Sequence, residues 1–147
     1  STEQIKELRE KTGAGIADIK KALEEAQGDA SKALAIIEQK LGGSAAKKAG
    51  RETKAGLVES YIHGNGKIGV LVELLCETDF VARNPEFKNL SHELAMQIAD
   101  MAPEDSESLL AGSFIKEPNK SVKDLVGEVA GKFGENIRVG RFSRIEL

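Results

Sequence analysis

One short segment of the 147-residue chain carries residue types suited to contact with another molecule, namely Thr78, Asp79, Phe80 and Val81. The segment lies between a strand-like apolar run and a helix signal at Asn84, so it is a connector. Connectors normally run over the protein surface, yet this one places an acid beside two apolar residues. Such a pair offers a charge and a large apolar side chain for binding, and we expect it to contact something outside the chain.

Residues with catalytic or metal-binding chemistry occur singly in this sequence. His63 stands next to a turn, and neither His92 nor an acid lies at ligand spacing from it, which favours an exposed strand-end histidine. Glu73 and Glu77 are too far apart on or near a strand to act as an acid pair, and we expect solvated edge charges. No Gly-Lys-Ser or Gly-Lys-Thr element is present to bind phosphate. The sequence therefore predicts a binding protein that is not an enzyme and has no cofactor, nucleotide or metal site of its own.

The composition sets further bounds on partners and location. The 21 Lys and Arg residues against 24 Asp and Glu give a net charge of -3, which provides no electrostatic reason for direct nucleic-acid binding. No apolar run approaches the roughly 20 residues of a membrane helix, and Ser1 to Gln4 lack the features of a signal peptide. We expect a cytosolic protein without membrane contact. The single cysteine, Cys76, lies on an apolar strand face and is expected to be a small buried side chain.

Residues 1–43 predict a three-helix module. Ser1 and Gln4 form a capping-box pattern, and apolar residues at helical spacing continue to about Lys11. The Thr12-Gly13-Ala14-Gly15 stretch predicts a tight turn before a second helix, which ends near Gly28.

Asp29 begins the third predicted helix, which carries Leu41 on its inner face and stops at Gly42-Gly43. Residues 44–55 follow as a helical or flexible linker with four cations. Because no aromatic residue is interleaved to stack on bases, these cations are expected to form a solvated face.

Residues 56–147 predict an α+β core with a small antiparallel sheet of about three strands packed with two amphipathic helices. Apolar residues alternate from Ile68 to Cys76, as in a half-buried strand. The Asn65-Gly66 pair before this run predicts a hairpin with a type I′ turn. Residues Asn84 to Ala102 predict a long amphipathic helix, with Pro85 at its first position.

The remainder of the core is less regular in sequence. We expect a loop or short exposed turn at Glu104 to Ser108 and irregular structure at Ser113 to Lys120. Ser121 with Asp124 predicts the start of a second helix that ends at Gly134. Asn136 to Leu147 predict a third strand, with a bulge near Gly140 because the alternation slips there.

Four separated stretches resemble the elongation factor Ts family, whose members are guanine-nucleotide exchange factors of elongation factor Tu. They are Leu8 to Gly15 followed by Asp18 to Leu23, Ala45 to Ala49, Thr78 to Asn84, and Gly134 to Ile137 with Arg141-Phe142. Together they span most of the chain in the order of the family. One departure is that a further helical stretch of the family is reduced here to Pro103 to Ser108, which leaves homodimer formation an open question.

The resemblance implies an N-terminal module of the ubiquitin-associated type that contacts the GTPase domain of elongation factor Tu. It also implies that Asp79 and Phe80 form a wedge inserted near the partner's magnesium ion, with Thr78 and Val81 shaping the loop. The module residues implied in partner contact are Arg9, Thr12, Gly13, Ala14, Gly15 and Ile16. The implied location is the bacterial cytoplasm, or the matrix of an organelle in a eukaryote.

Two other interpretations accompany these expectations. Phe80 could fold back beneath the long helix against Phe87. The Thr12 to Gly15 stretch could serve only to end one helix and begin the next. For the function, the alternative is a peptide-binding adapter of the ubiquitin-associated type that has no effect on nucleotide exchange.

Overall fold

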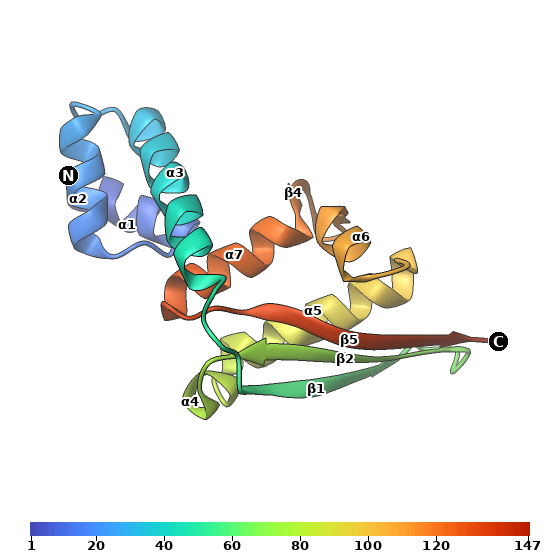
Figure 1. The fold of residues 1–147 in the computed structure, drawn as a ribbon. Coiled ribbons are helices and arrows are strands. Elements are labelled where there is room, and N and C mark those ends of the chain that lie inside the picture. Colours follow the sequence, from blue (N-terminus) through green and yellow to red (C-terminus); the bar gives the residue numbers. More distant parts are fainter.

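The structure is a computed structural model that describes the backbone of residues 1–147 and the side chains of residues 1–40 and 49–147. The elements along the chain are α1 (Thr2–Thr12), α2 (Ile16–Glu25), α3 (Ala30–Lys48), β1 (Ala55–Ile62), β2 (Ile68–Cys76), α4 (Asp79–Ala82), α5 (Pro85–Met101), α6 (Ser106–Ala111), β3 (Ser113–Phe114), β4 (Glu117–Ser121), α7 (Val122–Phe133) and β5 (Arg138–Glu146). Figure 1 shows α1 to α3 as one group of helices beside a sheet that carries helices on one face. The predicted α+β class is confirmed.

The three helices of the module surround their own small core. The Ser1 hydroxyl accepts a hydrogen bond from the Gln4 N–H at 3.3 Å, so the predicted capping box is present. The buried apolar side chains of this core are Leu8, Ala14, Ile19, Ala22, Leu23, Ala26, Ala33 and Ile37. They form a cluster distinct from the one beneath the sheet.

The predicted end of the third helix is wrong. Its backbone runs to Lys48, beyond the glycine pair at which we expected it to stop. A glycine in a helix interior costs only about 1 kcal/mol relative to alanine, and the residues that follow include strong helix formers. The side chains of Leu41, Lys47 and Lys48, to which we assigned an inner face and solvated charges, lie outside the described residues.

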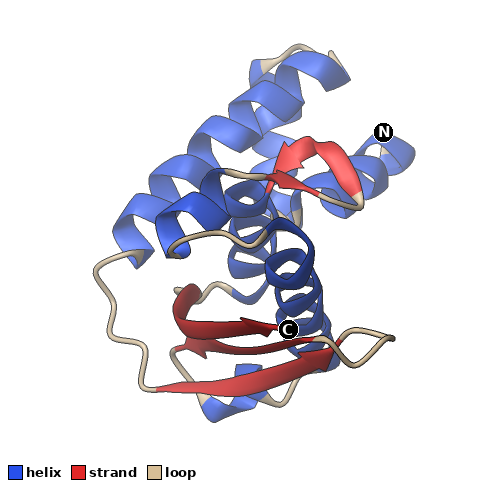
Figure 2. Cartoon of the chain, turned by 90° about the vertical axis from the view of Figure 1, so that its right-hand side faces the viewer, coloured by secondary structure: helices blue, strands red, loops and turns tan.

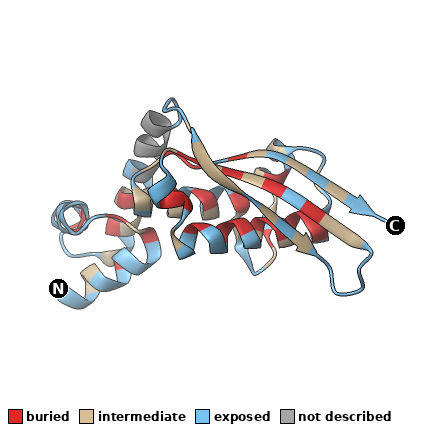
Figure 3. Cartoon of the chain, turned by 90° about the horizontal axis from the view of Figure 1, so that it is seen from below, coloured by how far each residue is buried: buried red, intermediate tan, exposed pale blue. Residues whose placement is uncertain are grey.

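The sheet of the core has the order β1-β2-β5, with both pairs antiparallel. The predicted strand Ile68–Cys76 is confirmed as its central member, and the inward side chains Val70, Val72, Leu74 and Cys76 are fully or almost fully buried. Helix α5 covers this inner face, as Figure 2 shows, and its apolar stripe at Phe87, Leu90, Leu94 and Ile98 is buried against the strands. Figure 3 shows the buried residues along β2 and on the helices behind the sheet.

The hairpin between β1 and β2 is confirmed, but its predicted turn type is wrong. The Gly66 N–H donates to the His63 carbonyl at 2.8 Å, which closes a β-turn centred on Gly64 and Asn65. Only Gly66 has a positive φ in this turn, 73°, whereas a type I′ turn needs positive φ at both central residues. The Asn65 side chain instead accepts from the Lys67 N–H at 2.9 Å, which stabilises the longer loop.

The predicted bulge near Gly140 is confirmed in β5. Val72 lies opposite Phe142 and Leu74 opposite Val139, so two residues of β5 face the single residue Glu73. Arg141 uses this geometry to donate to Glu73 from its backbone N–H and, at 2.9 Å each, from Nε and Nη2. These hydrogen bonds lower the pKa of Glu73 from 4.5 to about 2. Glu73 is therefore an ion-paired residue of the central strand and not the solvated edge charge that we expected.

Two predictions for the segment after α5 are wrong. Helix α6 occupies part of the expected loop, because the Asp105 side chain caps it by accepting from the Ser108 N–H at 2.8 Å and Leu109 is buried. The expected irregular stretch contains the antiparallel strands β3 and β4. Gln97 of α5 fixes this small ribbon by donating to the Ser113 carbonyl and accepting from the Ile115 N–H, both at 2.9 Å. Such long-range anchoring leaves no local pattern in the sequence.

Helix α7 matches its prediction. The Ser121 and Asp124 side chains form a reciprocal capping box, and Gly134 caps the other end with a φ of 67°. The helix packs against α5 and α6 and also contacts α1 and α3 of the module. None of the helices in the described part of the chain is long and apolar enough to cross a membrane.

Candidate functional site

The segment between β2 and α5 is more ordered than the connector that we expected. Residues Asp79–Ala82 form the one-turn helix α4, and Thr78 caps it by accepting a hydrogen bond from the Val81 N–H at 3.3 Å. Asn84 then begins α5 directly, because its side chain accepts from the Glu86 N–H at 2.9 Å. The segment is therefore fixed at both ends by capping side chains.

The side chains of α4 divide sharply into exposed and buried ones. Val81 and Ala82 are only 3% and 7% exposed and belong to the core, whereas Phe80 is 79% exposed. Phe80 thus does not fold back against Phe87, which is fully buried without it, and that alternative is wrong. Asp79 and Thr78 are also exposed. The Phe80 side chain therefore stands on a well-packed base and is free to contact another molecule.

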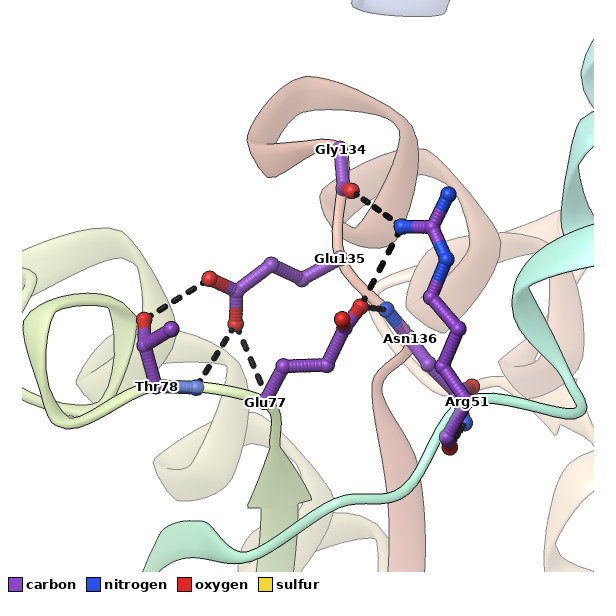
Figure 4. Close-up of polar contacts among 6 residues, drawn as sticks. All are labelled: Arg51, Glu77, Thr78, Gly134, Glu135 and Asn136. Carbon is purple, nitrogen blue, oxygen red and sulfur yellow. Dashed lines mark hydrogen bonds and ion pairs between the residues drawn. The ribbon is translucent and has the colours of Figure 1, made fainter.

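The base of α4 is held by a group of six residues that we call the clasp, namely Arg51, Glu77, Thr78, Gly134, Glu135 and Asn136 (Figure 4). The Glu135 carboxylate accepts from the N–H groups of Glu77 at 3.0 Å and Thr78 at 3.1 Å. It also accepts from the Thr78 hydroxyl at 2.7 Å. In return, the Glu77 carboxylate accepts from the Asn136 N–H, so each acid binds the backbone of the other's segment.

Arg51 joins the linker to the clasp. Its Nη1 lies 3.1 Å from the Gly134 carbonyl and 3.5 Å from the Glu77 carboxylate. Its own carbonyl accepts from the Asn136 side chain at 2.9 Å. We predicted the cations of residues 44–55 to be a solvated face, and Arg51 is indeed exposed, but its contacts to the clasp were not predicted. The contacts of Glu135 were not predicted either, because they join residues 57 and 58 positions apart and no periodic pattern marks such pairs.

Cys76 is buried at the end of β2, as predicted from its strand position. Burial raises the pKa of its thiol, so the neutral form is favoured. Its Sγ lies 3.2 Å from the Thr78 carbonyl, to which the thiol donates. The residue therefore packs beneath the connector and does not act as a reactive group.

The turn between α1 and α2 brings together the residues that the resemblance implied in partner contact, but two of them, Thr12 and Ala14, face inward. Thr12 is buried, and its hydroxyl donates to the Leu8 carbonyl at 2.6 Å while accepting from the Ala14 N–H at 3.2 Å. Ala14 is also buried. At these two residues the structure agrees with the alternative interpretation, in which they only form the turn between the two helices. Arg9, on the last turn of α1, is exposed.

Gly13 has a structural role of its own. Its φ of 70° is left-handed, and a Cβ added there would lie 2.4 Å from Cγ of Lys132 in α7. Glycine is therefore favoured by the turn, and a larger residue would also have to displace the Lys132 side chain. Gly15 and Ile16 follow at the start of α2, and Ile16 is 45% exposed. Arg9 and Ile16 are thus the side chains of this region best placed to contact a partner.

The remaining polar candidates form no catalytic arrangement. His63 is exposed, as predicted, and its Nδ1 lies 3.2 Å from the Tyr61 hydroxyl. Within the described residues, no group of three His, Cys, Asp or Glu side chains is placed to hold a metal ion. The arrangement that stands out is therefore the exposed Asp79-Phe80 pair on its buried base.

Comparisons with known proteins decide the family. The family model described as Elongation factor TS matches residues 77–147, which include α4 and the clasp turn before β5. Elongation factor Ts of Thermotoga maritima is 44% identical, and the alignment covers the whole chain and 96% of that relative. The chain belongs to the elongation factor Ts family. Elongation factor Ts of Carboxydothermus hydrogenoformans and of Leptospira biflexa are each 43% identical, with 88% and 97% of those relatives covered.

Membership of the elongation factor Ts family gives the chain a role in the elongation stage of protein biosynthesis. The alignments extend over 190 or 192 positions although the chain has 147 residues. The relatives therefore carry residues that have no counterpart in this chain. The reduced core expected from the sequence agrees with this difference in length.

Proposed function

We propose that this chain is a guanine-nucleotide exchange factor that binds elongation factor Tu and promotes the release of GDP. In this proposal the Asp79-Phe80 wedge enters the partner near its nucleotide-bound magnesium ion. The observation that supports it most directly is the 79% exposure of Phe80 on a helix whose next two residues are buried. The chain holds the phenylalanine in water in a defined position, ready to be buried elsewhere.

Burial of Phe80 in a pocket of the partner would supply the energy for the change. Transfer of a phenylalanine side chain from water into an apolar site is favourable by about 1.5 to 3 kcal/mol. Because α4 is already capped and packed, little conformational entropy is lost when the side chain docks. Most of the burial energy is then available to disturb the magnesium and GDP site.

Exchange follows from differential binding. If Phe80 is buried only when the magnesium site is distorted, the factor favours the conformation that binds GDP weakly. Linkage then requires the factor and the nucleotide to weaken each other's binding by the same ratio. The factor itself needs no nucleotide, metal or covalent step, and the more abundant nucleotide refills the partner.

A second contact is proposed at the module. Arg9 and Ile16 are exposed on adjacent helices, so they offer a charge and an apolar side chain for the GTPase domain of elongation factor Tu. Figure 1 places the module and α4 toward the same end of the molecule, away from the C-terminus. A partner that contacts both would be held by the module while the wedge acts. We propose the cytoplasm, or an organelle matrix, as the place of action.

The test is binding to immobilised elongation factor Tu with and without GDP and magnesium. An exchange factor binds most tightly when both are absent, because factor and nucleotide oppose each other. We expect retention of the full chain to fall by at least about tenfold when GDP and magnesium are added together. Equal retention under both conditions would instead support a peptide-binding adapter and contradict the exchange function.

The role of Asp79 is tested separately in a GDP-release assay. If its charge acts near the partner's cation, Asp79→Asn and Asp79→Ala slow release equally. If it only shapes the first turn of α4, the asparagine variant retains most of the activity, since asparagine has a similar size and polarity.

A further inference from the structure

The position of Phe80 depends on the backbone of α4, and the Phe80 side chain does not itself stabilise that backbone. Helix α4 has four residues, and forming one helical turn is unfavourable in isolation because several dihedral angles are fixed for each hydrogen bond made. Phe80 is too exposed to hold the turn by packing. Val81 and Ala82 hold the end of the turn in the core, so the direction of the Phe80 side chain also depends on what fixes the start of α4.

We propose that Glu135 is a positioning residue for the Asp79-Phe80 wedge and that it acts through Thr78. The carboxylate of Glu135 receives both the backbone N–H and the hydroxyl of Thr78, the residue that caps α4. The effect of Glu135 on nucleotide exchange rests on the proposed function. Its effect on the stability of α4 can be measured in the free chain, without a partner. Glu135 comes from the turn between α7 and β5, so a remote segment orients the wedge.

The Thr78 hydroxyl explains why an acid is needed at residue 135. A hydroxyl has one proton to donate and two lone pairs that accept. An ionised carboxylate only accepts, so Glu135 draws the proton of the hydroxyl toward itself at 2.7 Å. A lone pair of the same oxygen is then free for the Val81 N–H, 3.3 Å away. One contact thus fixes the rotamer that makes the other.

Glutamine at residue 135 would remove the charged acceptor from this arrangement with almost no change in size. Glu135 uses Oε1 for the two backbone N–H groups and Oε2 for the hydroxyl. An amide has one oxygen and one NH2 group, and the NH2 group cannot accept a hydrogen bond. In Glu135→Gln the amide oxygen can keep the two backbone N–H groups, but the NH2 group can only donate to the Thr78 hydroxyl, so the charged acceptor is lost and the direction of that hydrogen bond is reversed.

The first experiment needs no partner. Amide hydrogen exchange of the free chain, followed residue by residue, reports the opening of α4 at Val81 to Asn84. Hydrogen bonds to a charged acceptor are stronger than those to a neutral one, and Glu135 accepts three, so Glu135→Gln should speed exchange in α4 by at least about tenfold. The amides of Leu94 to Ile98 in α5 should keep their rates.

The matched control is Glu107→Gln, which removes one charge from an exposed position of α6. It should leave exchange in α4 unchanged. Unchanged exchange in α4 of Glu135→Gln would overturn the proposal. Equal acceleration in α4 and α5 would overturn it too, because Glu135 would then stabilise the whole core and not the wedge.

The second experiment asks whether Glu135 acts through Phe80. At saturating factor, Glu135→Gln should lower the maximal rate of GDP release from elongation factor Tu by about tenfold. Adding it to a variant that carries both Asp79→Ala and Phe80→Ala should change that variant's rate by less than about twofold, because missing side chains cannot be mispositioned. A full tenfold further loss in the combined variant would overturn the proposal. If the wild-type chain does not accelerate release, the proposed exchange function fails, and hydrogen exchange in α4 still decides the role of Glu135.

Discussion

Helix α4 and the turn between α1 and α2 are both short segments between longer elements, and sequence resemblance implied partner contact at both. In α4 the large apolar side chain, Phe80, points into solvent while Val81 joins the core. In the turn the arrangement is reversed, because Thr12 and Ala14 face inward and serve the fold of the module. Its exposed candidates, Arg9 and Ile16, lie on the flanking helices.

This difference separates residues that contact a partner from residues that hold the contact in place. A family motif contains both kinds, since the loss of either would weaken binding. Burial and hydrogen bonding distinguish them, because a residue that already satisfies its side chain within the fold gains little from a partner. On this basis we propose Phe80, Arg9 and Ile16 as the contacting residues, whereas Val81, Thr12 and Gly13 hold the two segments.

The largest expected difference in stability is between the alanine variants of the neighbouring residues Val81 and Phe80. Val81→Ala removes buried methyl groups and should lower the free energy of unfolding by about 2 kcal/mol. Phe80→Ala removes an exposed side chain and should change it by less than about 0.5 kcal/mol. Urea unfolding of the two variants measures both values, and similar losses would show that Phe80 is part of the packed structure.

Thr12 and Arg9 give the corresponding pair in the module. Thr12→Val keeps the size of the side chain but leaves the buried Ala14 N–H without its partner, which should cost about 1 to 2 kcal/mol. Arg9→Ala should cost less than about 0.5 kcal/mol. Hydrogen exchange of the α1 and α2 amides reports the stability of the module directly. Equal effects of the two variants would remove the distinction between holding and contacting residues there.

Substitution of Gly13 should lower the stability by a smaller amount, through backbone strain and through a collision with Lys132. Gly13→Ala forces an alanine into a left-handed conformation, at about 1 kcal/mol, and brings its Cβ against Lys132. Adding Lys132→Ala should relieve the collision and leave only the backbone strain. Thermal unfolding of both variants measures this recovery. If adding Lys132→Ala does not raise the unfolding temperature of Gly13→Ala, the module does not pack on α7 at this point.

The smallest effect is expected at Glu73, which lies outside both segments and serves as a reference. Its pKa of about 2 in the folded chain is below the ordinary 4.5, so the ion pair with Arg141 stabilises the fold above pH 4.5. This contribution is lost as the pH falls from 4.5 toward 2. In urea unfolding, the free energies of unfolding of the wild type and of Glu73→Gln should therefore become equal as the pH falls through this range. A constant difference between them would contradict the ion pair, and GDP release at pH 7 should be unaffected.

Local sequence patterns predicted those parts of the fold that local interactions stabilise. The capping boxes at Ser1 and Ser121, the strand Ile68–Cys76 and the bulge at Gly140 are all confirmed. Each depends on residues within a few positions or on a simple period of burial. Phe80 could be singled out for the same reason, since an apolar residue is unusual on a connector.

The missed features depend on distant residues. Helices α4 and α6 are too short to have a helical period, and they persist because caps and buried contacts hold them. The clasp joins Glu77 to residue 136 and Thr78 to residue 135, and no spacing rule connects such positions. The base of the candidate site could therefore not be predicted, although its exposed tip was.

The central claim is that α4 drives exchange while the module supplies affinity, and GDP release tests it most directly. Stopped-flow release of a fluorescent GDP analogue from elongation factor Tu is measured over a range of factor concentrations. Phe80→Ala should lower the maximal rate by at least about tenfold, given an apolar burial of about 1.5 to 3 kcal/mol. Arg9→Ala should raise the concentration needed for half of the maximal rate and leave that rate nearly unchanged. An unchanged maximal rate for Phe80→Ala would contradict the account.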